Sequence, residues 1–277
     1  MTLDAGQLQE DAAALSCVSP RRRRLGGGDI LGALLPVLAI AAIFVLWQAI
    51  VVLFNIPAYV FPRLDTTLGS LRDHWGDIWT NLLTTLTEAG VGFAIGNTLA
   101  VVGATAFVYS RPVERTLFPV AVLVQTIPIV VWSPILVIML SGLWPQIVVA
   151  ILISFFPALV NMVSGLRAVS PLELELFHVL NASRWQVYRK LRWPASLPYL
   201  FSSLRITSTL SLIGAIVGEY VAAGGGGVGY ELISAKSSLD TALVMAITLV
   251  VTVTGIVVFL AVAGLERLAL SRRGQGA

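Results

Sequence analysis

Long apolar stretches without a single charged side chain dominate the pattern of this chain. The longest runs from Thr116 to Leu166, and two others cover Ile30–Phe54 and Thr241–Leu265. A bilayer core about 30 Å thick requires roughly 20 apolar residues in a helix, so each outer stretch fits one span and the central stretch fits two. The pattern therefore predicts an all-α integral membrane protein.

We predict six transmembrane helices. The third and fourth are separated by a short turn, Ser141–Pro145, and Pro128 and Pro134 are expected to bend the third. Four glycines of the second span suggest close helix packing: Gly90, Gly92, Gly96 and Gly103. The predicted spans are Ile30–Phe54, Leu82–Tyr109, Thr116–Leu140, Trp144–Leu166, Leu197–Val221 and Thr241–Leu265.

Composition and charge agree with this prediction and add an orientation. Only 12% of the residues are charged, whereas a soluble domain carries about a quarter. If the N-terminus is cytoplasmic, 15 of the 18 Lys and Arg residues fall on the cytoplasmic side, as the positive-inside rule requires. Topology thus explains the net charge of +3 without nucleic acid. We expect a disordered cytoplasmic tail over 1–29, a transmembrane domain over 30–270 and a cytoplasmic C-terminal tail over 271–277.

The loop between the fourth and fifth spans, 167–196, is the one elaborate connection. Ser170 and Glu173 form a capping box around Pro171 at the first helical position, which predicts a short helix. Asn181 is expected to end that helix, because Asn tolerates the left-handed conformation of a C-terminal cap. The sequence thus predicts a first helix of a cytoplasmic helix–turn–helix bracket.

A second capping box, Ser183 and Gln186, begins another helix at once. Trp185 and other apolar residues alternate there with basic ones, and we expect Pro194 to stop the helix. An amphipathic bracket of this kind can lie in the lipid headgroups or dock into the groove of a partner protein. The pattern alone leaves both interpretations open.

The loop resembles the signature of the permeases of binding-protein-dependent ABC importers. That signature reads E-A-A, three residues, G, nine residues, I-x-L-P. Here Glu175, the spacing and Pro194 match, while Asn181 replaces the glycine and Leu176 and Phe177 replace the two alanines. The sequence around this signature resembles that of the permeases in the branch for nitrate, sulfonate, taurine and pyrimidine precursors. Further matching segments begin at Arg111, Pro194, Val217 and Gly226.

The resemblance implies a type I importer permease in the bacterial inner membrane. It implies four kinds of partner: a second permease copy, two cytoplasmic ATPase subunits, an extracytoplasmic solute-binding protein and membrane lipid. ATP and Mg would bind to the ATPase, so this chain is expected to be no enzyme and to hold no cofactor. The residues expected to couple it to the ATPase are Glu175, Phe177, His178, Asn181, Trp185 and Pro194.

Polar residues inside the predicted spans are candidates for the translocation path, because ionisable groups in a membrane often mark pathways. Glu219 is the first choice, with an interfacial pairing to Lys236 as the alternative, and Glu88 is a further candidate. Arg205 is expected to extend to the cytoplasmic face. The other path candidates are Gln125, Thr126 and Asn161.

Other chemistry finds little support in the sequence. The single Cys17 and two distant histidines offer no metal or catalytic cluster. The glycine run Gly224–Gly229 lacks the lysine of a nucleotide-binding loop, so we interpret it as a turn leading to an outer gate helix.

Two alternatives remain, an ion-coupled secondary carrier and a membrane-bound enzyme. Uptake that stops on ATP depletion but survives a proton uncoupler would distinguish the importer from the carrier. The substrate is expected to be a sulfonate-, taurine- or nitrate-like anion, or a vitamin precursor of pyrimidine or flavin type.

Overall fold

The computed structural model describes residues 27–222 and 226–271, and these form helices and connecting turns without a strand. The predicted tails, 1–29 and 271–277, fall almost entirely outside this part of the chain. The chain divides into two compact units, and the first ends at Leu53. Its helix, α2 (Gly27–Leu53), begins three residues before the predicted first span.

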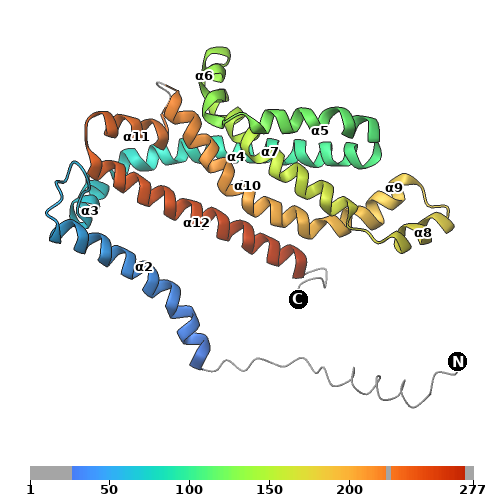
Figure 1. Ribbon diagram of the computed structural model, residues 1–277, viewed down its shortest axis with the longest axis horizontal. Coiled ribbons are helices and arrows are strands. Elements are labelled where there is room, and N and C mark those ends of the chain that lie inside the picture. Colours follow the sequence, from blue (N-terminus) through green and yellow to red (C-terminus); the bar gives the residue numbers. More distant parts are fainter. Residues whose placement is uncertain (1–26, 223–225, 272–277) are drawn as a thin grey trace. The chain divides into compact units, whose positions relative to one another are not determined.

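The second unit begins at Phe54 and contains the remaining helices (Figure 1). They are α3 (Leu64–Asp73), α4 (Trp75–Tyr109), α5 (Arg111–Thr126), α6 (Ile129–Met139), α7 (Trp144–Arg167), α8 (Pro171–Val179), α9 (Arg184–Val187), the π-helical turn η1 (Tyr188–Arg192), α10 (Trp193–Val221), α11 (Val228–Ser237) and α12 (Thr241–Ser271).

Four helical stretches of the described chain are long and apolar enough to cross a membrane, and a fifth results if the bent pair α5 and α6 counts as one span. The four are α4, α7, the continuous stretch Arg184–Val221 and Thr241–Ala269. In α2, the part Leu38–Leu53 qualifies only as a shorter apolar helix. The all-helical membrane fold is therefore confirmed, and the sixth span stays a prediction.

The third predicted span, Thr116–Leu140, is not one helix. It breaks at Ile127 and Pro128, and α5 and α6 meet there at 96°. Ile127 has an extended backbone (φ −73°, ψ 123°) because a following proline disfavours the helical conformation. Pro134 lies inside α6 without ending it. A bend was expected from both prolines, but Pro128 alone produces this break.

The core of the second unit lies where α4, α7 and α10 pack together. A Cβ on Gly92 of α4 would lie 2.5 Å from Ala150 Cβ of α7, and one on Gly214 of α10 would lie 2.8 Å from Ala150 Cα. These distances are shorter than any stable carbon contact, so the small residues bring the helix backbones close. The expected close packing is confirmed at Gly92 and Gly96, but Gly90 has no neighbour within 4 Å.

Candidate functional site

The bracket between α7 and α10 begins with both predicted caps. Ser170 Oγ accepts from the Glu173 N–H and the Glu173 carboxylate accepts from the Ser170 N–H, which completes the first capping box. At the other end, Asn181 has the predicted left-handed backbone (φ 50°). Its N–H and that of Ala182 donate to the carbonyls of His178 and Phe177. This Schellman arrangement ends α8 firmly.

The second helix of the bracket does not stop at Pro194. The capping box of Ser183 and Gln186 forms as predicted, but α9, η1 and α10 then continue as one helical stretch, Arg184–Val221. In the π-helical turn, the Trp193 N–H donates a hydrogen bond to the Tyr188 carbonyl, five residues earlier in the chain. This shift of register lets Pro194, which has no N–H to donate, sit at the start of α10. The expected helix stop is therefore wrong.

Helix α8 presents an apolar face that no described residue of the second unit covers. Leu172, Leu176 and Val179 are 75%, 57% and 77% exposed, and their spacing places them along one side of the helix. Trp185 of α9 is also exposed. We call these four residues, together with exposed Leu180, the α8 apolar patch.

The predicted coupling residues lie on and beside this patch. Glu175, His178 and Asn181 are exposed, whereas Phe177 is half-buried. His178 also lines a cavity of about 290 Å³ together with Tyr109 of α4 and Arg184 of α9. Trp185 stacks on Tyr188 at a ring distance of 5.6 Å, which fixes its position on the surface.

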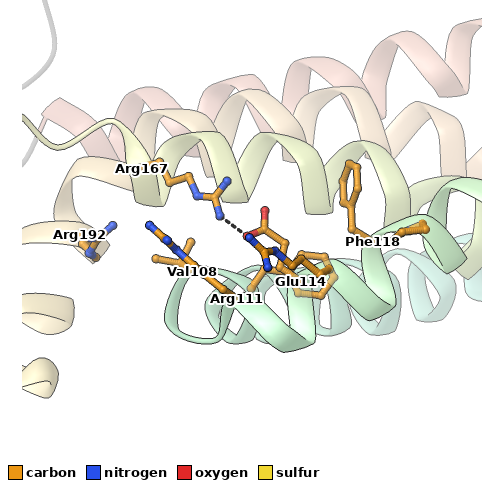
Figure 2. A pocket seen from close by; sticks show the side chains of 9 residues that line it. Val108, Arg111, Glu114, Phe118, Arg167 and Arg192 are labelled. Atoms are coloured by element: carbon orange, nitrogen blue, oxygen red, sulfur yellow. Dashed lines mark hydrogen bonds and ion pairs between the residues drawn. The ribbon is translucent and has the colours of Figure 1, made fainter.

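A larger cavity, about 720 Å³, opens between the ends of α4, α5 and α7 next to this bracket (Figure 2). Four arginines and one glutamate line it, so it is strongly basic. Arg167 Nη2 lies 2.7 Å from Glu114 Oε2, and Arg192 donates to the Leu166 carbonyl at 2.8 Å. The sequence placed these arginines on one side of the membrane, but it did not reveal that they surround a cavity. The arginines are Arg111, Arg115, Arg167 and Arg192.

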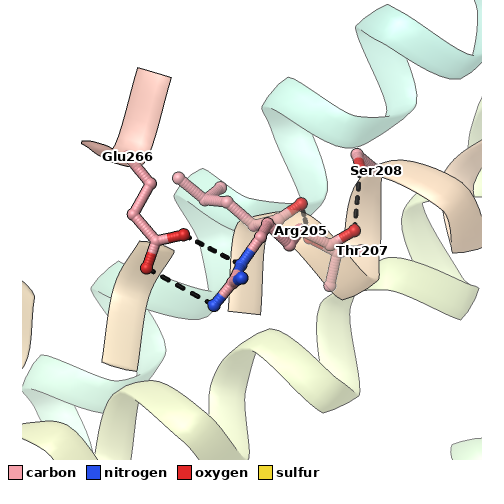
Figure 3. Close-up of polar contacts among 5 residues, drawn as sticks. Arg205, Thr207, Ser208 and Glu266 are labelled. Carbon is pink, nitrogen blue, oxygen red and sulfur yellow. Dashed lines mark hydrogen bonds and ion pairs between the residues drawn. The ribbon is translucent and has the colours of Figure 1, made fainter. Parts of the chain in front are cut away.

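Arg205 forms an ion pair within the second unit, and its extension to the cytoplasmic face stays a prediction. Its Nε lies 2.9 Å from Glu266 Oε2 in α12, so the side chain joins α10 to α12 (Figure 3). Close by, Thr207 donates to the Asn97 side chain of α4 at 3.1 Å. Polar contacts therefore tie α10 to two neighbouring helices.

Four of the five path candidates, all except Glu88, occupy different surroundings. Gln125 and Thr126 are exposed at the end of α5, directly before the break at Pro128. Asn161 is half-buried and donates to the Pro157 carbonyl of its own helix at 2.9 Å. Glu219 is buried, with 1% of its surface exposed. Within the described residues, no hydrogen bond joins any two of the four.

The N-terminus of α11 forms a polar site that the sequence reasoning did not assemble. The N–H groups of Gly227, Val228 and Gly229 donate to Asn81 Oδ1, Thr85 Oγ1 and Glu219 Oε2, at 3.0, 3.0 and 2.7 Å. Side chains of α4 and α10 thus satisfy the first N–H groups of a third helix, which would otherwise lack partners. The sequence had singled out Glu219 and the glycine turn before α11. The spacing of Asn81 and Thr85, one helical turn apart, was the only hint that α4 takes part in the same site.

Two further contacts complete this end of the unit. Asn81 Nδ2 donates to Glu231 Oε2 at 2.9 Å, and burial raises the pKa of Glu231 although this hydrogen bond acts in the opposite direction. Lys236 donates to the Tyr220 hydroxyl at 3.1 Å and not to Glu219, so the alternative pairing for Glu219 is absent from the structure. The described residues contain no cluster of His, Cys, Asp or Glu that could hold a metal ion.

Relatives with known descriptions match most of the chain. A probable ABC transporter permease protein of Haemophilus influenzae is 32% identical over 78% of this chain and 88% of its own length. The riboflavin transport system permease protein RibX of Chloroflexus aurantiacus is 32% identical over 91% and 94%. The formylaminopyrimidine transport permease protein ThiX of Halalkalibacterium halodurans is 29% identical over 87% and 96%.

A solved structure shares the fold. The chain matches a structure of the MetNI methionine ABC transporter in an inward-facing conformation, with a TM-score of 0.56 and 18% identity, over 69% of this chain and 94% of the other. Residues 96–271 match the family described as the inner membrane component of binding-protein-dependent transport systems. With that match and the relatives above, the chain belongs to this family of ABC transporter permeases.

Proposed function

We propose that this permease couples ATP hydrolysis by a partner subunit to the import of a small solute, and that the α8 apolar patch is the surface that the ATPase contacts. The patch supports this proposal because a short, doubly capped helix exposes Leu172, Leu176 and Val179 on one side. Contiguous exposed apolar surface of this kind marks interaction sites. In this proposal Glu175 and Asn181 set the bend of the bracket, and Phe177, His178 and Trp185 border the contact.

The connection from α8 to the membrane is suited to transmit movement. The chain passes through the left-handed Asn181 into the capped helix that starts at Arg184. From there it continues without interruption to Val221, beside the α11 site. A displacement of α8 and α9 by the ATPase would therefore reach the other end of the unit through one continuous helix. The π-helical turn at Tyr188–Arg192 is a candidate hinge, since such turns mark functional bends.

The proposed assembly contains two copies of this chain, two ATPase subunits and a solute-binding protein on the outer side, in an inner membrane with both termini cytoplasmic. ATP and Mg would bind to the ATPase subunits. For the substrate we propose a vitamin precursor of flavin or pyrimidine type, because RibX and ThiX are among the relatives that cover most of this chain. A sulfonate- or nitrate-like anion is the second candidate, since permeases named for these solutes are also similar.

The substitution Val179→Glu tests the coupling surface. A carboxylate placed in an apolar protein interface loses hydration without a partner, so we expect retention of the ATPase subunits during purification to fall by about tenfold or more. Because Val179 is 77% exposed, the permease itself should remain folded. The measurement is the amount of ATPase subunit recovered with the tagged permease, together with ATP-dependent uptake in vesicles.

Leu239→Glu is the matched control. Leu239 is similarly exposed, at 71%, but lies in the turn between α11 and α12, at the other end of α10 from the bracket. We expect this variant to retain the ATPase as the wild type does. Equal retention by Val179→Glu and the wild type would refute the proposed contact.

A further inference from the structure

Two carboxyl groups lie side by side inside the helix bundle. Glu88 of α4 and Glu219 of α10 are 0% and 1% exposed. The neighbouring N–H groups of Val228 and Gly229 donate to Thr85, one helical turn before Glu88, and to Glu219. The two carboxyl groups are thereby brought close enough to interact. Both residues belong to helices long and apolar enough to span a membrane. Ionisable groups in such a place are costly and require an explanation.

Among the residues that the structure describes, no positive charge neutralises this pair. In the described part of the chain, the ion pairs are Arg167 with Glu114 and Arg205 with Glu266, and Lys236 is bonded to Tyr220. Both carboxyl oxygens of Glu88 and Oε1 of Glu219 are buried without a donor from any other described residue. Two ionised carboxylates in this position would repel one another with little screening. A hydrogen bond between them requires one proton.

The two acids have unequal surroundings, and the difference indicates which of them carries the proton. Glu219 Oε2 accepts from the Gly229 N–H at 2.7 Å and lies at the N-terminus of α11, where the helix dipole favours a negative charge. Glu88 receives no such hydrogen bond. The environment therefore favours an ionised Glu219 and a protonated Glu88 that donates to Glu219 Oε1.

The turn before α11 packs closely against the carboxyl group of Glu219. A Cβ on Gly227 would collide with the carboxyl atoms of Glu219, and one on Gly229 would lie 3.0 Å from Glu219 Oε2. Glycine at these two positions lets the turn before α11 close directly over the acid.

We propose that Glu88 and Glu219 form a proton-binding site, in which the acid on α4 donates to a carboxylate on α10 that caps α11. The ligand is a single proton, and its role is to fasten α11 to two membrane helices with only one net negative charge. Glu219 thereby acts as a positioning residue for α11. This inference concerns the permease alone and does not depend on the α8 apolar patch.

The proposal distinguishes two substitutions of Glu88. Glu88→Gln supplies an amide N–H to Glu219 in place of the acid proton, whereas Glu88→Leu supplies no donor. We expect Glu88→Gln to melt within about 2 °C of the wild type and Glu88→Leu to melt about 5 °C lower or more, because an unpaired buried carboxylate is destabilising. The measurement is thermal unfolding of the full-length chain in lipid nanodiscs.

Infrared spectroscopy of the same samples detects the proton directly. At neutral pH the wild type should show a carbonyl stretch of a protonated carboxylic acid that disappears in Glu88→Gln. This infrared measurement can be made even if Glu88→Leu does not fold. It does not require transport, so its result is independent of the coupling experiment.

Two results would overturn the proposal. One is an infrared difference spectrum between the wild type and Glu88→Gln without a protonated-acid band. The other is a wild type that lacks the band and whose melting temperature rises in sodium chloride relative to choline chloride, since the pair would then hold a cation.

Discussion

Among single residues, Gly227 has the strictest conformational requirement at the α11 site. Its φ of +92° lies in a region of backbone conformation that residues with a side chain rarely adopt. A Cβ at this position would also collide with the Glu219 carboxyl group. Its N–H also donates to Asn81. Backbone conformation, close packing and hydrogen bonding therefore all depend on the absence of a side chain at this position.

We expect Gly227→Ala to destabilise the protein more than Gly226→Ala. Both glycines have positive φ, so both substitutions incur a backbone strain of about 1–3 kcal/mol. At Gly226, however, the nearest atom to an added Cβ is Asn81 Oδ1 at 3.7 Å, an ordinary contact. The difference between the two melting temperatures measures the collision with Glu219, and equal values would contradict it.

Between whole elements, packing at small residues holds α4 against α7. Gly92 and Gly96 contact Ala150 and Ser154 at distances that leave no room for a methyl group. In a membrane there is little hydrophobic driving force between helices, so close packing of this kind contributes much of the association. At Gly90, two residues from Gly92, an added Cβ would meet no atom within 4 Å, so this position is open to substitution.

Gly92→Val and Gly90→Val form a matched pair for this interface. Gly92→Val forces the two helices apart, with an expected cost of about 1–3 kcal/mol. Gly90→Val keeps the packing and should change stability little. Thermal unfolding in the same lipid checks both variants, and the interface is misassigned if Gly90→Val is the more damaging one.

In the second unit as a whole, the ion pair of Arg205 and Glu266 joins segments 61 residues apart in sequence. The Glu266 side chain is only 14% exposed, so removing either partner leaves a poorly hydrated charge. This contact connects α10, which continues from the bracket, to the last membrane helix.

A double-mutant cycle tests the energetic coupling of that pair. We expect Arg205→Gln and Glu266→Gln each to destabilise the protein, and the double variant to be more stable than the sum of the two losses by about 0.5–3 kcal/mol. Additive losses would show that the charges do not interact across α10 and α12.

Much of the local structure could be predicted from neighbouring residues. Ser170, Glu173, Ser183 and Gln186 form the expected capping boxes, and Asn181 has the expected left-handed backbone. Each of these features depends on contacts a few residues apart, which the sequence displays directly. The apolar stretches likewise predicted membrane helices from length and composition alone.

Prolines show where local reasoning was insufficient. Pro128 turns the chain by 96°, whereas Pro134 and Pro194 are accommodated within helical structure. The difference arises from what surrounds each residue. Around Pro194, a π-helical turn absorbs the missing hydrogen bond. Sequence alone does not state which of these outcomes tertiary packing selects.

The sequence by itself determined the membrane class, most of the helices and the capped bracket, because these follow from composition and short-range contacts. The family resemblance came from the motif around Glu175, Asn181 and Pro194. Only the tertiary structure decided that Glu219 meets Glu88, that Asn81 and Thr85 cap α11, and that Arg205 pairs with Glu266. Those contacts join residues up to 146 positions apart. Such partners are brought together by the packing of the helices, and no local pattern in the chain encodes them.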